Sequence, residues 1–81
     1  MNKIIEFMRL SLMEKEIPLS WGISNIEISK DRLNFDVVAS KYQGKVMIYE
    51  HEKEISVRLR ERTKTFISTK ELLLWLDNLI E

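Results

Sequence analysis

Apolar positions at the start of the chain recur with the period of a helix. Within residues 2–16 they follow one another at helical spacings, and they are Ile4, Ile5, Phe7, Met8, Leu12 and Met13. This spacing places them on one broad face of an α-helix. Asn2 suits the N-cap position, and Pro18 disfavours helical backbone at the residue before it. We therefore predict an amphipathic helix over residues 2–16.

Apolar and polar positions alternate with a period of two between residues 21 and 64. Alternate side chains of a β-strand point to opposite faces of its sheet, so each such run predicts a strand with one apolar face. The apolar members of the four runs are Ile26 and Ile28, then Leu33, Phe35, Val37 and Ala39, then Val46 and Ile48, and lastly Ile55, Val57 and Leu59. The sequence therefore predicts four strands.

Three short turns would join these strands into an antiparallel meander, at Lys30-Asp31, Gln43-Gly44 and Glu52-Lys53. Residues directly opposite each other in a hairpin share a face, so the register must bring apolar residues together. The predicted pairs are Ile28 with Leu33, Ile26 with Phe35, Ala39 with Ile48, Ile48 with Val57, Val46 with Leu59 and Met47 with Arg58.

The end of the chain returns to the helical period. The apolar stripe of residues 69–80 consists of Leu72, Leu73, Leu76, Leu79 and Ile80. Ser68 and Glu71 have the spacing of a capping box, in which a hydroxyl and a carboxylate accept hydrogen bonds from free amides at a helix start. We predict a helix over residues 69–80 with Ser68 as its N-cap.

The predicted order is α-β-β-β-β-α, an α+β fold in a single small domain over residues 1–81. A four-stranded sheet with one apolar face needs a cover, so we place both helices on the same face. The predicted core contains Phe7, Met8, Leu12, Ile26, Phe35, Val37, Ile48, Val57, Leu59, Leu72, Leu76 and Leu79. Trp21 is predicted to close the open end of this core, because tryptophan is highly buried on average; the alternative is an anchor for a partner.

Composition narrows the class of protein. Of 81 residues, 44% are hydrophobic and 32% charged, which is typical of a globular chain. Thirteen basic residues balance thirteen acidic ones, so no overall charge attracts nucleic acid or membrane. There is no cysteine for a disulfide or a thiolate-bound metal. Glu6 and Arg9 interrupt any signal-like apolar run, and we expect a cytoplasmic protein without membrane contact.

No catalytic pattern is visible. A chain of this length leaves little room for a deep cleft, and the sequence has no phosphate-binding glycine loop or metal-binding histidine motif. His51 lies among Glu50, Glu52 and Glu54, but ligands at a hairpin tip are not held in fixed geometry. We predict a protein that is not an enzyme and has no cofactor or metal.

An apolar patch is predicted on the open face of the sheet. The apolar members of that face are Ile23, Val38, Met47 and Tyr49, and charged side chains surround them. The first hypothesis is a non-enzymatic protein-interaction module that uses this face or an exposed edge strand. Its partner would be another protein or a second copy of the chain, since a two-fold contact uses the same patch twice.

A basic stripe in residues 58–64 supports a second hypothesis. On one extended last strand, Arg58, Arg60, Arg62 and Lys64 would share a side at intervals of about 6.5–7 Å. Such a row can contact successive phosphates, and Tyr49 on the neighbouring strand can stack a base. The alternative to this nucleic-acid backbone binder is edge protection, since charges on an edge strand prevent sheet-to-sheet aggregation.

Overall fold

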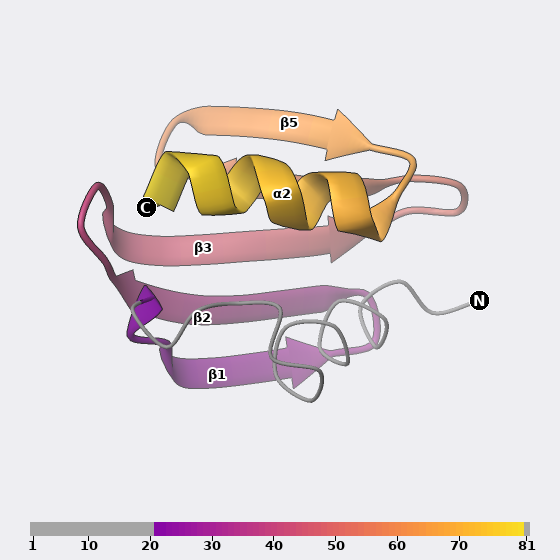
Figure 1. The fold of residues 1–81 in the computed structure, drawn as a ribbon. Coiled ribbons are helices and arrows are strands. Elements are labelled where there is room, and N and C mark those ends of the chain that lie inside the picture. Colours follow the sequence, from indigo (N-terminus) through magenta and orange to yellow (C-terminus); the bar gives the residue numbers. More distant parts are fainter. Residues whose placement is uncertain (1–20, 81) are drawn as a thin grey trace.

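The structure, a computed structural model, describes residues 21–80 of the chain. Its elements are β1 (Ser24–Ser29), β2 (Arg32–Val38), β3 (Gln43–Glu50), β4 (Ile55–Leu59), β5 (Arg62–Phe66) and α2 (Thr69–Ile80). The strands form one antiparallel sheet in the order β1-β2-β3-β4-β5 (Figure 1). The small α+β fold is confirmed, with five strands instead of four; the helix predicted over residues 2–16 lies outside the described residues.

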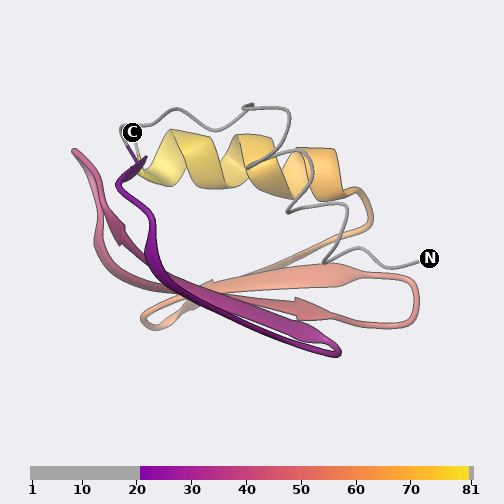
Figure 2. The same cartoon turned by 90° about the horizontal axis from the view of Figure 1, so that it is seen from below.

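A second layer covers one face of the sheet. Figure 2 shows α2 lying over a curved sheet, and the helix packs on β4 and β5. Helix placement and strand order together make a two-layer arrangement, in which an amphipathic helix buries the apolar face of a sheet. No helix within residues 21–80 is long and apolar enough to cross a bilayer.

The fifth strand arises from a turn that the sequence pattern did not reveal. β4 ends at Leu59, and β5 begins at Arg62, which lies opposite Leu59 across the two-residue turn. Arg60 takes the left-handed conformation in this turn, with a φ of 56°. Tight turns with positive φ usually contain glycine or asparagine, and neither is present here. The single extended strand predicted for residues 55–64 is therefore wrong.

The turn between β2 and β3 also differs from the prediction. It lies at residues 39–42, where the Ala39 N–H donates to the Tyr42 carbonyl oxygen at 3.0 Å. Ile48 consequently lies opposite Leu33, so the predicted pairing of Ala39 with Ile48 is wrong. The displacement is an even number of residues, and the apolar side chains therefore remain on the same face.

Gly44 has a different role from the turn residue that we predicted. It lies within β3 opposite Val37, with a φ of 150°. A Cβ atom at this position would lie only 3.1 Å from the Tyr42 hydroxyl oxygen. The glycine therefore allows the Tyr42 side chain to approach the strand closely.

Most of the predicted core is confirmed. The buried members are Phe35, Val37, Ile48, Val57, Leu59, Leu72 and Leu76, and Leu79 packs against them half-buried. Three other pairings are also confirmed: Ile28 with Leu33, Ile48 with Val57 and Val46 with Leu59. Phe7, Met8 and Leu12 lie outside the described residues. Trp21 is fully buried, and its Nε1 donates to Asp77 Oδ1 at 2.9 Å, which confirms that it closes the core.

Ile26 is a wrong member of the predicted core. It is 45% exposed, and Ile28 is 53% exposed, although both alternate with polar residues as core positions do. They lie on β1 at the edge of the sheet, while α2 packs on β4 and β5 at the other side (Figure 1). A bulge between Ser24 and Glu27, where Asn25 has a φ of 51°, also disrupts the expected pairing of Ile26 with Phe35.

Ser68 caps α2 as predicted. The Glu71 N–H donates to Ser68 Oγ at 3.4 Å, and the Leu72 N–H donates to the Ser68 carbonyl oxygen at 3.2 Å. The hydroxyl therefore satisfies one of the amides that have no partner within the helix.

Replacing this cap tests how much the hydroxyl contributes. We expect Ser68→Ala to lower the free energy of unfolding by about 0.5–2 kcal/mol and Ser68→Asp to be nearly neutral, because aspartate also accepts from the first amides of a helix. Denaturant unfolding of both variants measures the difference. Equal losses in the two variants would show that the hydroxyl contributes nothing specific as a cap.

Candidate functional site

The predicted apolar patch is not contiguous. Ile23 is half-buried and packs against the core, so its place in the patch is wrong. The other three members share one face of the sheet. Met47 lies between Asn34 and Arg58, and Tyr49 lies between Arg32 and Ser56. Val38 lies opposite Gln43 instead, and the Asp36–Lys45 pair separates it from the row that contains Met47. The displaced turn between β2 and β3 causes this separation. Val38 is therefore an isolated exposed side chain, 62% accessible.

The remaining apolar groups of the open face are partly covered by their neighbours. The Arg32 guanidinium lies 5.0 Å from the centroid of the Tyr49 ring, which is a cation–π distance. The Tyr49 hydroxyl donates to Met47 Sδ at 3.7 Å. Both residues are half-buried. The open face consequently presents mainly polar and charged groups around a small apolar centre.

The predicted basic stripe is divided between two strands and both faces. Arg58 lies opposite Met47 and Thr63 on the open face, as its predicted pairing with Met47 requires. Arg60 lies in the turn. Arg62 and Lys64 pair with Leu59 and Val57, so they belong to the face on which α2 lies. The single row of four cations on one strand is therefore wrong, while binding of nucleic acid itself stays a prediction.

Lys64 extends over aromatic rings beside α2. Its Nζ lies 5.6 Å from the centroid of Phe66 and 5.9 Å from that of Trp75. The two rings also contact each other, with centroids 5.6 Å apart. An ammonium group over aromatic faces is stabilised without an acidic partner. Lys64 therefore has a local structural partner and lies apart from the other members of the predicted stripe.

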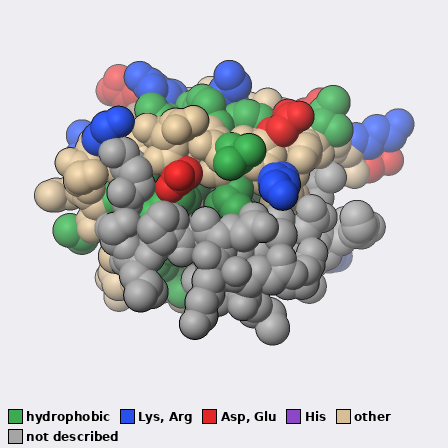
Figure 3. All heavy atoms as spheres, in the orientation of Figure 1, with side chains coloured by type: hydrophobic (Ala, Val, Ile, Leu, Met, Phe, Trp, Pro, Cys, Tyr) green, Lys and Arg blue, Asp and Glu red, His purple; other side chains and the backbone are tan. Residues whose placement is uncertain are grey.

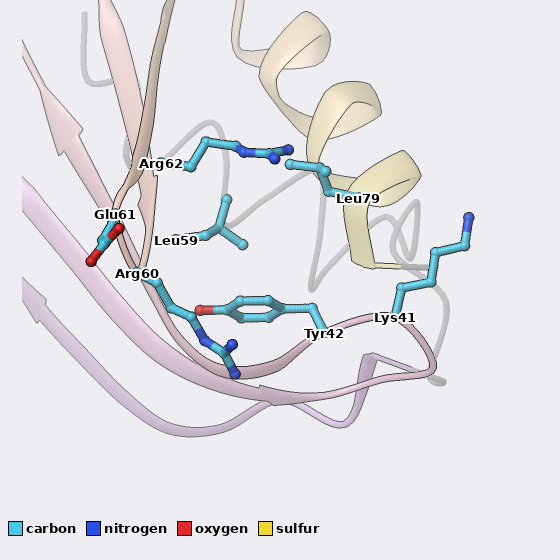
Figure 4. Close-up of a pocket in the computed structure, with 7 residues that line it drawn as sticks. All are labelled: Lys41, Tyr42, Leu59, Arg60, Glu61, Arg62 and Leu79. Atoms are coloured by element: carbon cyan, nitrogen blue, oxygen red, sulfur yellow. The ribbon is translucent and has the colours of Figure 1, made fainter.

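Two members of the stripe meet in a pocket that the sequence did not reveal. The pocket has a volume of about 320 Å³, and Lys41, Tyr42, Leu59, Arg60, Glu61, Arg62 and Leu79 line it (Figure 4). It lies where the β2–β3 turn, the β4–β5 turn and the end of α2 meet. Its lining therefore includes three cationic residues and three residues with apolar groups.

Arg60 is held in place by several contacts. Its Nη2 donates to the Gln43 carbonyl oxygen at 2.7 Å, and its guanidinium lies 5.2 Å from the centroid of the Tyr42 ring. The Tyr42 hydroxyl in turn donates to the Lys45 carbonyl oxygen at 2.6 Å. Figure 4 shows the Arg60 guanidinium beneath the ring and the Arg62 side chain directed toward Leu79. The Arg60 side chain is therefore fixed in position by contacts with Gln43 and Tyr42.

The two edges of the sheet differ in chemistry. On β1 all six residues are exposed, with Ile26 and Ile28 as apolar members and Glu27 as the one charge. β5 carries Arg62 and Lys64 with three other residues. In Figure 3, Lys and Arg side chains are visible along the upper edge, where β5 lies. β5 therefore has the charged character of a protected edge, and β1 does not.

The histidine at the β3–β4 turn has a local partner. His51 Nε2 lies 2.9 Å from Ser56 Oγ, within hydrogen-bond distance. Within residues 21–80 no group of three or more histidine, aspartate or glutamate side chains is arranged to hold a metal ion. Among the described residues, His51 is therefore part of a side-chain hydrogen bond and not of a cluster of metal ligands.

Comparisons of the chain with protein-family models, with curated proteins and with solved structures find no match.

Proposed function

We propose that this domain is a protein-interaction module that binds an extended segment of a partner along β1, an edge strand of the sheet within residues 21–80. The exposure of Ile26 and Ile28 on that edge strand carries the proposal. An edge strand leaves alternate N–H and C=O groups unpaired toward solvent, and an added strand satisfies them. In such binding the backbone supplies affinity, and alternate side chains supply specificity.

The contrast between the two edges favours β1 over β5. Arg62 and Lys64 oppose the approach of another strand to β5, because charged edge residues disfavour added pairing. On β1 the bulge between Ser24 and Glu27 leaves residues 27–29 as the regularly paired segment, with Ile26 directly before it. An incoming strand would therefore be short, and its affinity would depend on the side chains beside Ile26 and Ile28.

The charge of Glu27 indicates the chemistry of the partner. If two copies paired antiparallel so that Ile26 met Ile28 of the other copy, Glu27 would lie opposite Glu27. Like charges directly opposite each other destabilise a strand pair. A foreign strand with a basic residue between two apolar residues satisfies both isoleucines and the carboxylate. The proposed partner is therefore a protein segment of alternating apolar–basic–apolar character.

A charge exchange tests this proposal. The probes are two synthetic peptides, one carrying Ile-Lys-Ile between threonines and a matched one carrying Ile-Glu-Ile. The unmodified protein should bind the lysine peptide more tightly, and Glu27→Lys should reverse the preference. The two peptides should differ roughly tenfold in affinity for each protein. The reason is that the residue opposite position 27 attracts it in one peptide and repels it in the other. Fluorescence anisotropy measures affinity, and amide NMR shifts locate binding on β1.

A matched control is Glu54→Lys, which makes the same charge change at an exposed residue of the β3–β4 turn. It should leave both affinities unchanged. Equal effects of the two variants, or shifts that map to the open face or to β5, would contradict the proposal. Self-association is checked in parallel by sedimentation: Glu27→Thr should associate more strongly than the unmodified protein, because it removes the repulsion between two β1 strands.

Nucleic-acid binding is the alternative function, and the gathering of cations at the β4–β5 turn is the observation in its favour. Two or three phosphate contacts would give a salt dependence of log affinity with a slope of about −1.4 to −2.1 for a single strand. Micromolar binding of single-stranded DNA with such a slope, lost in an Arg58→Glu, Arg60→Glu double variant, would favour this alternative over strand addition at β1.

A further inference from the structure

We infer that the pocket at the end of α2 binds a small organic anion that joins a phosphate group to an apolar body. Its lining combines three cationic side chains, Lys41, Arg60 and Arg62, with the apolar groups of Leu59, Tyr42 and Leu79. Arginine and lysine are the residues that hold phosphate in proteins. This site is separate from the β1 edge and does not depend on the proposed strand addition.

The charge of the pocket lining favours an anion. Three cations and the Glu61 carboxylate give a local net charge of +2 (3 − 1 = +2). In Figure 4 the Glu61 side chain lies on the outside of the turn and points away from Lys41 and Leu79. Within the described residues, neither the Lys41 ammonium nor the Arg62 guanidinium forms a side-chain hydrogen bond or ion pair. Both groups are therefore available to a ligand.

The size and the interior of the pocket suit a small ligand with an apolar body. A volume of about 320 Å³ lies at the lower end of the range for small-molecule sites. Leu59 is buried, whereas Tyr42 and Leu79 are half-buried and expose apolar surface beside the cations. Inorganic phosphate would leave this surface in contact with water. A ligand that covers it gains the free energy of apolar burial as well as the charge contacts.

The backbone of Arg60 gives independent support. A φ of 56° is a left-handed conformation that is unfavourable for arginine and that glycine adopts freely. The side chain is nevertheless held by Gln43 and Tyr42 at the pocket wall. Strained residues that the surrounding structure holds in place are concentrated at functional sites. The arginine is therefore consistent with a binding role that a glycine turn would not supply.

A structural role for these cations is the competing explanation. α2 has no basic residue in its last turn, and the Lys41 N–H donates to the Ile80 carbonyl oxygen at 2.8 Å. Cations beside a helix C-terminus stabilise the helix through its dipole. This role predicts a lower melting temperature for variants without Arg62 or Lys41, and it predicts no ligand binding. The two explanations therefore differ in a measurable way.

The test is an NMR titration of the full chain with phenyl phosphate, inorganic phosphate and phenol. We expect phenyl phosphate to shift the amides of the pocket residues, with a dissociation constant below about 1 mM. Inorganic phosphate should bind at least about tenfold more weakly, and phenol should not saturate, because each lacks one half of the proposed contacts. Equal affinities for the two phosphates would overturn the apolar part of the inference.

Variants connect the shifts to the pocket. Arg62→Glu and Arg60→Gly should each weaken phenyl phosphate binding by about tenfold or more, the scale of a lost charge-assisted hydrogen bond. Arg60→Gly loses the contacts with Gln43 and Tyr42 but relaxes the backbone, so its melting temperature should change little. Lys53→Glu, at an exposed residue of the β3–β4 turn, is the control and should leave affinity within about twofold.

Two results would overturn the inference. One is an absence of shifts at the pocket with phenyl phosphate up to about 10 mM, far above the affinity expected of a real site. The other is an equal loss of affinity in Lys53→Glu and Arg62→Glu, which would show attraction by general surface charge.

Discussion

Replacing Phe35 by alanine is expected to lower the free energy of unfolding by about 3–5 kcal/mol. Phe35 is 2% exposed and lies on β2, opposite Val46 of β3, in the apolar face of the sheet. Removing the ring loses its burial and leaves a cavity that a small core fills only in part. A domain of this size has a free energy of unfolding of about 5–15 kcal/mol. The substitution would therefore remove a large fraction of that free energy.

Urea unfolding, followed by circular dichroism, measures the Phe35 effect. Ile28→Ala is the matched control, because Ile28 lies on the same face of the sheet but is 53% exposed. Its cost should stay below about 1 kcal/mol, as for most changes at exposed positions. A loss for Phe35→Ala no larger than that of the control would show that the apolar face of β2 does not form the core.

Trp21→Ala should have an effect of similar size, about 3–5 kcal/mol. Trp21 has no exposed surface, and its indole N–H donates to Asp77 on α2. This bond joins the segment before β1 to the helix that ends the described chain. Removing the indole therefore loses apolar burial, a hydrogen bond and a link between distant parts of the fold.

Separate variants distinguish these contributions. Trp21→Phe keeps much of the apolar surface and removes the donor, so it should cost less than Trp21→Ala. Asp77→Asn keeps an acceptor oxygen and should cost less than about 1.5 kcal/mol, the scale of a single hydrogen bond. Denaturant unfolding of the three variants gives the comparison. An equal cost for Trp21→Phe and Trp21→Ala would mean that ring burial contributes little.

The two proposed sites can be tested independently. The edge of β1 lies at the start of the sheet order, whereas the pocket joins two turns to the end of α2. Glu27→Lys should therefore leave phenyl phosphate binding unchanged, and Arg62→Glu should leave the peptide preference unchanged, since distant sites are generally additive. Failure of either proposal alone is distinguishable from failure of both.

Local patterns in the sequence were sufficient to predict most of the elements. Helix α2 and its cap follow from an apolar stripe preceded by Ser68, and the first four strands follow from alternation. The face of the sheet on which each side chain lies was more predictable than the register between neighbouring strands. Ile48 pairs with Leu33 and not with Ala39, yet both alternatives bring apolar residues together. Alternation determines which face a side chain occupies, but it does not distinguish registers that differ by an even number of residues.

The β4–β5 turn shows where local pattern becomes insufficient. Alternation continues through residues 58–64, and Arg60-Glu61 contains no residue that favours a tight turn. Only pairing of β5 with β4, and packing of Phe66 against Trp75, identifies the fold-back. The same turn separates Arg58 from Arg62 across the sheet. The basic stripe was therefore visible as charge in the sequence, while its geometry depended on contacts with other elements.

The chain by itself determined an antiparallel sheet with one apolar face, a capped C-terminal helix and a central core around Phe35. Tertiary structure alone decided that Ile26 is exposed, because α2 lies over β4 and β5 and leaves β1 at the edge. It also brought Lys41, Arg60 and Leu79 together in one pocket. The physical reason is the distance along the sequence over which each property is determined. Local backbone geometry sets the direction of a side chain, whereas its exposure and its neighbours depend on segments far away in the sequence.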